Sequence, residues 1–311
     1  MKKQATRDAY GQALLELGAL YDNIVVLDAD LSKSTKTVEF ARAYPERFIN
    51  AGIAEQNMMG MAAGLASCGK VVFASSFAIF ATGRAFEQVR NSIAYARLNV
   101  KICATHAGIT VGEDGSSHQS VEDIALMRSV PNMTVIVPSD GISTRQALFQ
   151  LYQHDGPAYL RLGRPAVPQV HDPGLDFAIG QAVELRRGKD LSLMACGIMV
   201  SKALQAAEIL AAEGIEVSVV DMLSIKPLDK EMIIRKARES GALLTLEEHS
   251  IIGGLGSSIC EAVCEYCPVP VTCLGINDLF GQSGSPEELL QYYGLGVEQI
   301  VEKARKLLKK K

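Results

Sequence analysis

The chain contains 311 residues, and its 31 Lys and Arg against 35 Asp and Glu give a formal net charge of −4. This small negative balance gives no reason to expect nucleic acid or a membrane surface as a partner. No run of about 18 apolar residues occurs, and the first residues lack the apolar core of a secretion signal, so we expect a cytoplasmic protein. The length suffices for two domains of ordinary size.

The first half alternates between helical and strand patterns. A helix is expected over 6–20, a core helix from Glu55 onward, and another helix over 140–153. The strands are continuous β-branched runs, which are typical of parallel strands covered on both faces. They are expected at 24–29, 47–50, 71–75, 100–104, 133–137 and 158–162. The pattern predicts a doubly wound, three-layer α/β domain with a sheet of about six strands.

A break follows this domain, because three prolines fall in the stretch that Gly163 and Gly174 bracket. Such a stretch favours an extended linker, expected at about 163–180, with a boundary near residue 172. We therefore expect one domain over 1–172 and a second over 173–311.

The second half repeats the alternation, which predicts another doubly wound domain around a parallel or mostly parallel sheet. Its strands are expected at 191–195, 216–220, 242–246 and 269–274, and its helices at 199–213, 229–239, 255–266 and 297–308. A glycine-rich stretch, 253–257, opens one of these helices. A tight strand-to-helix turn is favoured there over a phosphate site, because the stretch fits neither G-x-G-x-x-G nor a P-loop. The preceding Glu247, Glu248 and His249 suit an interface of unspecified kind.

Seven cysteines without a secretion signal indicate reduced thiols rather than disulfides. Cys260, Cys264 and Cys267 have the C-x3-C-x2-C spacing of some iron–sulfur sites, and Cys273 follows shortly after. The first three also fall at i, i+4 and i+7 of the helix expected over 255–266, where cysteine commonly serves as a small buried residue. The helical interpretation is favoured, and the role of these cysteines is left open.

Glu55 is the single acid in the otherwise uncharged run 49–66, and no charged partner is near it in sequence. One interpretation is that it occupies the first turn of a helix, where a negative charge is favoured by the helix dipole. The other is that a carboxylate held in apolar surroundings shares a proton with a ligand.

Further candidates follow the carboxyl ends of strands, the edge where open α/β sheets bind ligands. Asp30 and Ser34 follow the strand at 24–29, and capping of the next helix is the alternative for both. Phe77 and Phe80 follow the strand at 71–75, where they could stack on a planar ligand or simply pack in the core.

The loop over 108–119 is rich in glycine and polar residues, and such loops often carry function, although a merely solvated loop is the alternative. His106 and His118 lie in and beside it, with Asp114 between them. The spacing of the two histidines does not fit a helical metal site, so we expect no metal to be held by this chain alone.

Taken together, these residues resemble the pyrimidine-binding domain of transketolase, a thiamine diphosphate enzyme, and the second half is similar to that family's third domain. The resemblance covers nearly the whole chain. It rests on these motifs: Tyr10-Gly-Gln-Ala-Leu14, Ile53-Ala-Glu55-Gln-Asn-Met58, Ser76-Phe77-Ala-Ile-Phe80, Arg84-Ala-Phe-Glu-Gln88, Gly112-Glu-Asp-Gly115, Arg128-Ser-Val-Pro131 and Pro138-Ser-Asp-Gly141.

The resemblance implies roles for the candidates. Glu55 matches the acid that bonds to a ring nitrogen of the cofactor's aminopyrimidine, and Phe80, with Phe77 beside it, matches the aromatic residue that stacks on that ring. The substrate-binding positions that it implies are Arg7, Asp30, Ser34, His106, Asp114 and Arg164, of which four hold the sugar phosphate: Arg7, Ser34, His106 and Arg164. Asp114 matches the acid that bonds to a substrate hydroxyl, and Asp30 is expected on the same pocket wall. We expect Glu55, His106, Asp114 and His118 to take part in catalysis.

Transketolases carry, ahead of this region, a domain with a Gly-Asp-Gly motif that holds magnesium and the cofactor's diphosphate, and no Gly-Asp-Gly occurs here. The chain also begins almost where the pyrimidine domain begins. We therefore expect the C-terminal subunit of a split transketolase, which transfers a two-carbon ketol unit between sugar phosphates. Its thiamine diphosphate and Mg²⁺ would be held mainly by a separate N-terminal subunit, in a homodimer core or a heterotetramer that is inactive without that partner.

Three alternatives remain open from sequence: a component like deoxyxylulose-phosphate synthase, one like the β chains of 2-oxoacid dehydrogenases, and a non-catalytic paralogue. Sequence leaves undetermined the preferred sugars, the oligomeric state without the partner, and the role of the second domain.

Overall fold

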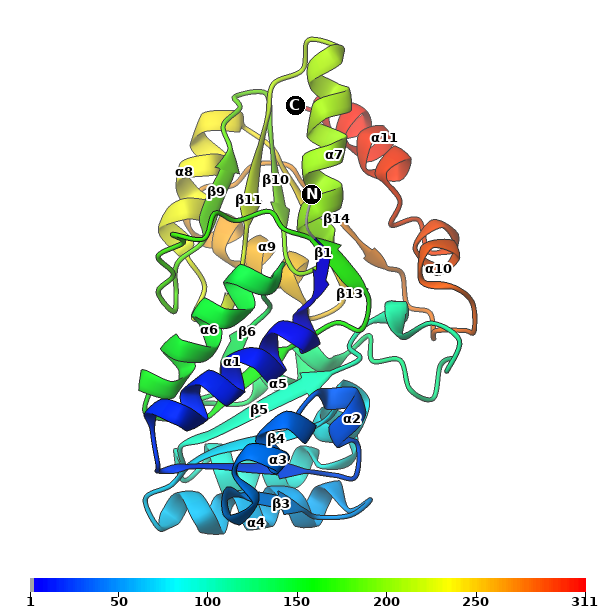
Figure 1. Cartoon of the computed structure of the whole chain (residues 1–311). Coiled ribbons are helices and arrows are strands. Elements are labelled where there is room, and N and C mark those ends of the chain that lie inside the picture. The colour runs from blue at the N-terminus through cyan, green and yellow to red at the C-terminus, as the bar shows by residue number, and fades with distance from the viewer. Residues whose placement is uncertain (1–2) are drawn as a thin grey trace.

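The computed structural model describes residues 3–311. They form two α/β halves arranged end to end, and each half is built around its own sheet (Figure 1). The sheet of the first half has seven strands in the order β12-β6-β7-β5-β4-β2-β3. Its bounds are β2 (Ile24–Asp28), β3 (Phe48–Asn50), β4 (Val71–Phe77), β5 (Val100–Thr105), β6 (Thr134–Ile136), β7 (Ala158–Arg161) and β12 (Ser224–Lys226). All neighbours are parallel except β12, which runs antiparallel to β6. The first six strands were predicted, and β12 is contributed by the second half.

Helices cover both faces of this sheet, as predicted. One face carries α1 (Thr6–Leu20), α3 (Val38–Ala43) and α6 (Gly141–Gln153), and the other carries α4 (Glu55–Ser67), α5 (Asp123–Ser129) and the π-helical turns η2 (Phe80–Arg84) and η3 (Gln88–Ala94). Strand β2 shows why a continuous apolar run is needed: Ile24 and Val26 pack toward α1, whereas Val25 and Leu27 pack toward α4. Successive side chains point to opposite faces, so a strand between two helical layers must be apolar throughout.

Short elements complete this half. They are β1 (Lys3–Ala5), α2 (Ser32–Thr35), η1 (Pro45–Arg47), η4 (Ile109–Val111) and β8 (Ala166–Pro168). Strand β8 lies in the stretch predicted as a linker, and it pairs with β1 in a separate two-stranded sheet. The predicted boundary near residue 172 stays a prediction.

The second sheet has the order β14-β13-β10-β11-β9 and is parallel except for β9, as the mostly parallel prediction required. Its strands are β9 (Val183–Arg186), β10 (Leu191–Ala195), β11 (Val217–Asp221), β13 (Leu243–Ser250) and β14 (Val271–Ile276). Helices α8 (Lys230–Ser240) and α9 (Leu255–Tyr266) cover one face, α7 (Met199–Ala212) and α11 (Val297–Leu308) cover the other, and α10 (Pro286–Tyr292) lies at the edge near η4. Elements β9, β12, α5 and α10 were not predicted.

The two halves share an apolar core, because one continuous cluster contains Met58 of α4 and Ile259 of α9. A buried polar cluster also joins them. His171 Nε2 lies 2.9 Å from Asp221 Oδ2 and 3.2 Å from Ser139 Oγ, and Ser139 also hydrogen-bonds Asp221. The cluster draws on the first half, the connecting stretch and β11, so all three are held together.

The glycine-rich turn before α9 is confirmed as a tight turn. The amides of Leu255 and Gly256 donate to the two carboxylate oxygens of Glu247, at 2.7 and 2.8 Å. A Cβ on Gly254 would lie 2.1 Å from the same carboxylate, which explains a glycine there. The chain's own acid thus satisfies the helix N-terminus.

The cysteines of α9 do not form the buried face that the helical spacing predicted, because Cys264 is exposed. Cys260 Sγ lies 3.9 Å from Cys273 Sγ of β14. Across residues 3–311 there is no group of three or more His, Cys, Asp or Glu placed to hold a metal ion.

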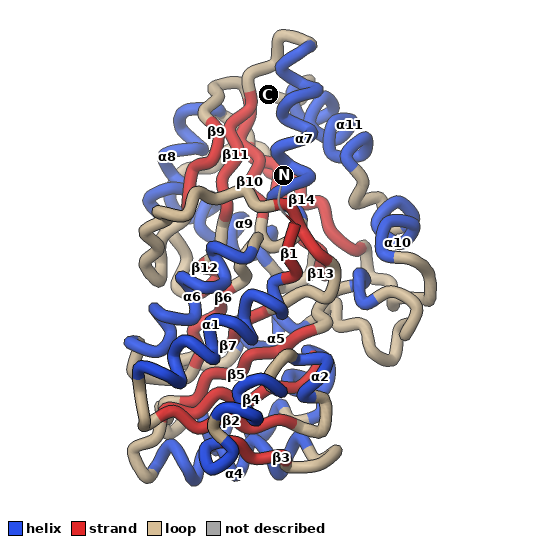
Figure 2. The backbone as a smooth tube through the Cα atoms, viewed as in Figure 1, coloured by secondary structure: helices blue, strands red, loops and turns tan. Residues whose placement is uncertain are grey.

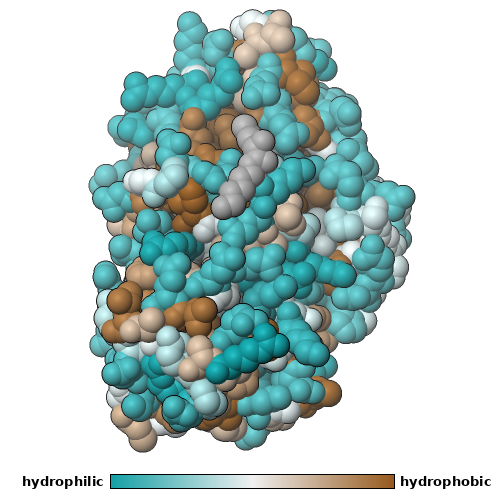
Figure 3. Space-filling model, viewed as in Figure 1, coloured by the Kyte–Doolittle hydropathy of each residue, from teal (hydrophilic) through white to brown (hydrophobic). Residues whose placement is uncertain are grey.

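The face drawn in Figure 3 is mostly hydrophilic, with brown apolar patches interrupted by polar side chains. Within the part of the chain that the structure describes, no helix is both long enough and apolar enough to span a membrane.

Candidate active site at the carboxyl edge of the first sheet

The candidate residues gather where β2, β4 and β5 end. Parallel strands place their carboxyl ends on one edge of the sheet. The loop that follows β5, tan in Figure 2, extends from this edge and lies beneath α10 in Figure 1. Loops from three neighbouring strands therefore meet around one position.

Glu55 is the first residue of α4, which confirms the predicted helix start, and its side chain is only 2% exposed. The carboxylate does have a partner: Arg84 donates a hydrogen bond to Glu55 Oε2 at 2.9 Å. The Arg84 side chain is about half exposed, at 48%. Sequence reasoning missed this residue because it lies 29 positions away, although it opens one of the motifs that carried the resemblance.

Two phenylalanines lie beside this ion pair. The rings of Phe77 and Phe80 are nearly parallel with centroids 6.1 Å apart, and the Arg84 guanidinium carbon lies 4.5 Å from the centre of the Phe80 ring. Neither phenylalanine belongs to the three apolar clusters that fill the described structure. Phe80 therefore presents an aromatic face to a planar group that also hydrogen-bonds Glu55.

Both histidines of the region stack against these rings. His106 lies on Phe77 with centroids 3.8 Å apart, and His118 meets Phe80 edge-on at 5.4 Å. The structure thus brings Glu55, Phe77, Phe80, His106 and His118 into one connected group.

The hydrogen bonds of His106 define its tautomer. Its Nε2 lies 3.1 Å from Arg7, whose guanidinium can only donate, so Nε2 accepts and the proton resides on Nδ1, 2.8 Å from Thr105 Oγ1. Burial, together with the positive charges of Arg7 and Arg164, lowers the pKa of His106 to about 3. The imidazole is therefore neutral, and its backbone is held at φ 59°.

Arg7 is oriented by His106 and by the backbone carbonyl of Ser34, at 3.2 Å. Its Nε is buried and has no hydrogen-bond partner among residues 3–311. Ser34 thus contacts Arg7 through its backbone carbonyl, and the predicted role of its side chain toward the sugar phosphate stays a prediction. A partly buried guanidinium with an unused donor is suited to an anionic group.

Arg164 reaches the loop over 108–119 from the other side. It hydrogen-bonds the carbonyl of Val111, and its guanidinium lies 3.6 Å from Asp114 Oδ2 and 3.7 Å from Glu113 Oε2. Asp114 is 41% exposed, so its carboxylate can reach a ligand in solution. Arg164 and Asp114 thus place a cation and an acid next to each other on the exposed side of the site.

Asp30 follows the end of β2 and is held by Asn50. Its side chain and its amide both bond to Asn50, at 3.0 and 3.1 Å, and its backbone has φ 64°. The alternative that Asp30 and Ser34 cap the next helix is wrong, because Asp28 accepts the hydrogen bonds of Leu31 N and Thr35 Oγ1 instead.

Comparison with known proteins agrees with this geometry. Residues 2–169 match the family described as transketolase, pyrimidine binding domain, and residues 180–300 match transketolase, C-terminal domain. The chain belongs to the transketolase family. It is therefore part of a thiamine diphosphate enzyme that transfers ketol groups, and within that family it corresponds to the C-terminal section.

Several relatives have the same extent as this chain. A protein of Methanocaldococcus jannaschii described as a transketolase C-terminal section is 51% identical over 98% of this chain and 96% of its own length. One of the subunits of the apulose-4-phosphate transketolase of Phocaeicola vulgatus is 40% identical over 98% of each chain. Human transketolase is 40% identical over 99% of this chain, which spans 50% of the human protein.

A solved structure titled split gene transketolase, inactive beta4 tetramer, is 55% identical to this chain and superimposes with a TM-score of 0.92 over 98% of both chains. The predicted family and fold class are confirmed. The roles of individual site residues remain predictions.

Proposed function

We propose that the chain is the C-terminal subunit of a split transketolase, acting in the cytoplasm, which moves a two-carbon ketol unit between sugar phosphates. Its active site is shared with a separate N-terminal subunit that holds Mg²⁺ and the diphosphate of the cofactor. The observation that best supports this proposal is the arrangement of Glu55, Arg84 and Phe80. The planar guanidinium of Arg84 lies between the buried carboxylate of Glu55 and the ring face of Phe80.

These residues fit an aminopyrimidine. A guanidinium is flat and carries N–H groups in its plane, and here it both stacks on Phe80 and bonds to Glu55. A heteroaromatic ring likewise needs an aromatic face on which to stack and a hydrogen-bonding group in its plane. We infer that Glu55 holds a proton between its carboxylate and a ring nitrogen, while Phe77 and Phe80 fix the plane of the ring.

When bound, thiamine diphosphate supplies the electron sink that the transfer of a carbon unit requires. The chain's own residues bind the sugar phosphate. Arg7 and Arg164 offer positive charge, and neutral His106 offers a hydrogen-bonding ring that is held by Arg7 and Thr105. Asp114 and His118, on the loop over 108–119, face substrate hydroxyls.

The assembly follows from the division of the site. The Phocaeicola vulgatus relative, which is a separate subunit of the same length, supports a partner N-terminal subunit for this chain. The split-gene structure is described as an inactive β4 tetramer, which supports assembly of this chain with itself before the partner joins. A homodimer core that recruits two N-terminal subunits gives a heterotetramer. The chain alone is expected to be inactive.

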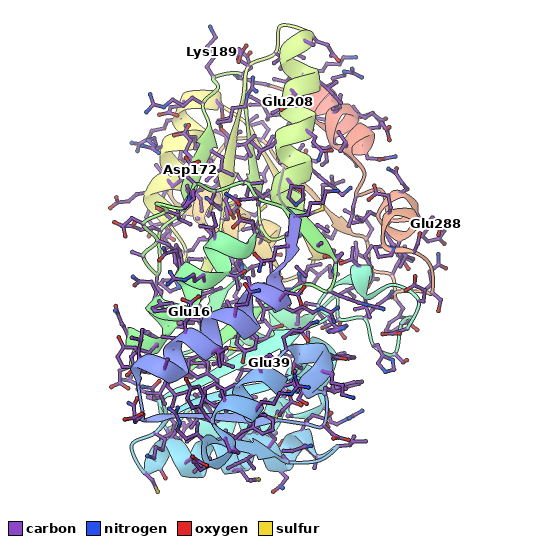
Figure 4. All side chains as sticks on the ribbon, in the orientation of Figure 1. Glu16, Glu39, Asp172, Lys189, Glu208 and Glu288 are labelled. Atoms are coloured by element: carbon purple, nitrogen blue, oxygen red, sulfur yellow. The ribbon has the colours of Figure 1, made fainter. Side chains whose placement is uncertain are left out.

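Reconstitution tests the proposal. The chain is purified with thiamine diphosphate and Mg²⁺ and assayed with xylulose phosphate as ketol donor, before and after addition of the N-terminal subunit from the same host. Turnover is expected only in the mixture, and Glu55→Ala is expected to abolish it. The matched control is Glu208→Ala, because Glu208 is exposed on α7, which packs on the second sheet (Figure 4).

Full activity of the isolated chain would contradict the shared site. Turnover of pyruvate instead of xylulose phosphate would replace ketol transfer by the chemistry of a related synthase or dehydrogenase. Failure of the mixed subunits to bind thiamine diphosphate in a titration would instead identify a non-catalytic paralogue.

A further inference from the structure

The loop over 108–119, here called the substrate loop, carries Asp114 and His118. It is closed at its base, where Gly108 N donates to Ser120 O at 2.8 Å. Compact surface loops whose ends meet are usually packed by their own side chains. This one is packed largely by the second domain.

Gln119 is the central contact. Its side chain is buried, and its amide nitrogen lies 3.0 Å from Ile109 O, 3.3 Å from Gly112 O and 2.9 Å from Gln282 O. The first two carbonyls belong to the substrate loop, and the third belongs to the second domain. One amide therefore ties the start of the loop to its end and fastens both to the other half of the chain.

Residues 277–285, here called the supporting segment, are themselves anchored. Tyr293 donates to Phe280 O at 2.7 Å, and Ser285 forms a capping box with Glu288, which lies at the start of α10 (Figure 4). The substrate loop lies directly on this segment: a Cβ on Gly115 would come within 2.7 Å of Ser283 Oγ.

A second contact fixes the start of the substrate loop. Glu248, near the end of β13, accepts a hydrogen bond from Thr110 N at 2.6 Å, and a Cβ on Gly108 would lie 2.3 Å from its carboxylate. Arg161 of β7 donates to the backbone carbonyl of Glu248 at 2.9 Å. The carboxylate is thus aimed at the loop by a bond from the first sheet.

We propose that the second domain positions the substrate loop for catalysis, with Gln119 as the positioning residue and the supporting segment as its base. The proposal rests on the proposed function, since Asp114 and His118 are taken to contact the sugar. Gln119 and His118 are adjacent and have different contacts. Gln119 is held against the supporting segment, and this orients the neighbouring His118 toward Phe80. This gives the second domain a role in substrate binding.

The test uses Gln119→Met in the full chain. Methionine keeps the length of the side chain and removes its hydrogen bonds. Amide hydrogen exchange over 108–120 is expected to be about tenfold faster, because the hydrogen bonds of the Gln119 side chain no longer oppose opening of the loop. In the complex with the N-terminal subunit, KM for donor and acceptor sugars is expected to rise about tenfold, with a smaller change in kcat.

The matched control is Arg128→Met, which removes contacts of α5 with Gly253 O and Glu261 in the second domain but leaves the substrate loop alone. Its exchange over 108–120 and its KM are expected to match those of the wild type. A purely structural loss lowers the active fraction and hence kcat, whereas a misplaced loop raises KM.

The two proposals fail differently. Absence of ketol transfer in the wild-type complex would overturn the proposed function. Transfer by the wild type with an unchanged KM in Gln119→Met, or unchanged exchange over 108–120, would overturn the positioning role of Gln119.

Discussion

Glu55 and Arg84 form an ion pair of unequal burial: the Glu55 side chain is almost fully enclosed, whereas the Arg84 side chain, which donates to it at 2.9 Å, is half exposed. The acid has lost most of its water, so it depends on one partner for compensation. The partner can leave toward solvent at little cost. A buried acid with a displaceable partner is suited to exchange that partner for a ligand.

This relationship predicts the effect of Arg84→Ala. The change leaves an uncompensated buried carboxylate, which is destabilising, although the exposure of Arg84 limits the loss to about 1–2 kcal/mol. Urea unfolding followed by circular dichroism measures it. In the double variant Glu55→Gln/Arg84→Ala most of the loss is expected to disappear, because no charge remains buried. Strictly additive losses would show that the two side chains do not interact.

The tautomer of His106 leads to a spectroscopic prediction. Because its pKa is lowered to about 3, its ring is expected to stay neutral, with the proton on Nδ1, at pH 5, where an ordinary histidine is charged. Nitrogen-15 NMR of the ring distinguishes these states. The unfolded chain takes up the proton below about pH 6.5, so this group's contribution to stability is present above that pH and is lost as the pH falls toward 3.

The variant Arg7→Met tests whether the charge of Arg7 helps to lower the pKa of His106. Loss of the neighbouring cation is expected to raise the pKa of His106, but not to its ordinary value, because burial is the larger cause. A titration that is identical in the variant and the wild type would exclude Arg7 as a source of the shift.

His171 behaves in the opposite sense. Although burial opposes its charge, hydrogen bonding to Asp221 and the nearby acids raise its pKa above the ordinary value. Its stabilising effect is therefore fully present below about pH 6.5 and is lost as the pH rises through the raised value of the folded state. We expect His171→Gln to lower the unfolding free energy by roughly 3 kcal/mol at pH 6 and by less at pH 9. The other histidines are common to both proteins and cancel in the difference. A difference that is flat with pH would show that His171 is uncharged in the folded protein.

Alanine substitutions at Gly52 and Gly108 distinguish the cost of backbone strain from the cost of a steric clash. Gly108 and Gly52 both have positive φ, but a Cβ on Gly108 would strike the Glu248 carboxylate, whereas nothing lies within 4 Å of a Cβ on Gly52. Gly52→Ala is expected to cost about 1 kcal/mol from the backbone alone. Gly108→Ala is expected to cost about 2 kcal/mol more from overpacking. Thermal unfolding of the two variants measures the difference, and equal losses would mean that Glu248 moves aside freely.

Much of the fold was predictable because the strands between helical layers are apolar throughout and therefore easy to recognise. Strand β12 was not, because it is only three residues long and nothing local marks it as a strand. The start of α4 at Glu55 was predictable from its place at the head of an apolar run. Its partner Arg84 was not, since their contact depends on how a π-helical turn after β4 meets α4.

In the site, too, some residues were predictable from the sequence and others were not. The resemblance named Phe80, His106 and His118, and the structure brings them together with Glu55. It also placed Asp30 in the pocket wall, which stays a prediction; the structure adds that Asp30 is held there by hydrogen bonds to Asn50. Gln119 and Glu248 were not predicted because their importance comes from contacts across the two halves, which no local pattern encodes.

Strand β12 closes the exposed edge of the first sheet with three residues from beyond the connecting stretch. A fragment ending near residue 172 would leave the backbone groups of β6 open to any other extended chain. The two halves are thus covalent neighbours that also complete each other's hydrogen bonding. A fragment ending at Lys226 would instead cut the second sheet between β10 and β13, so any attempt to produce the first half alone should supply another strand in place of β12 if aggregation is to be avoided.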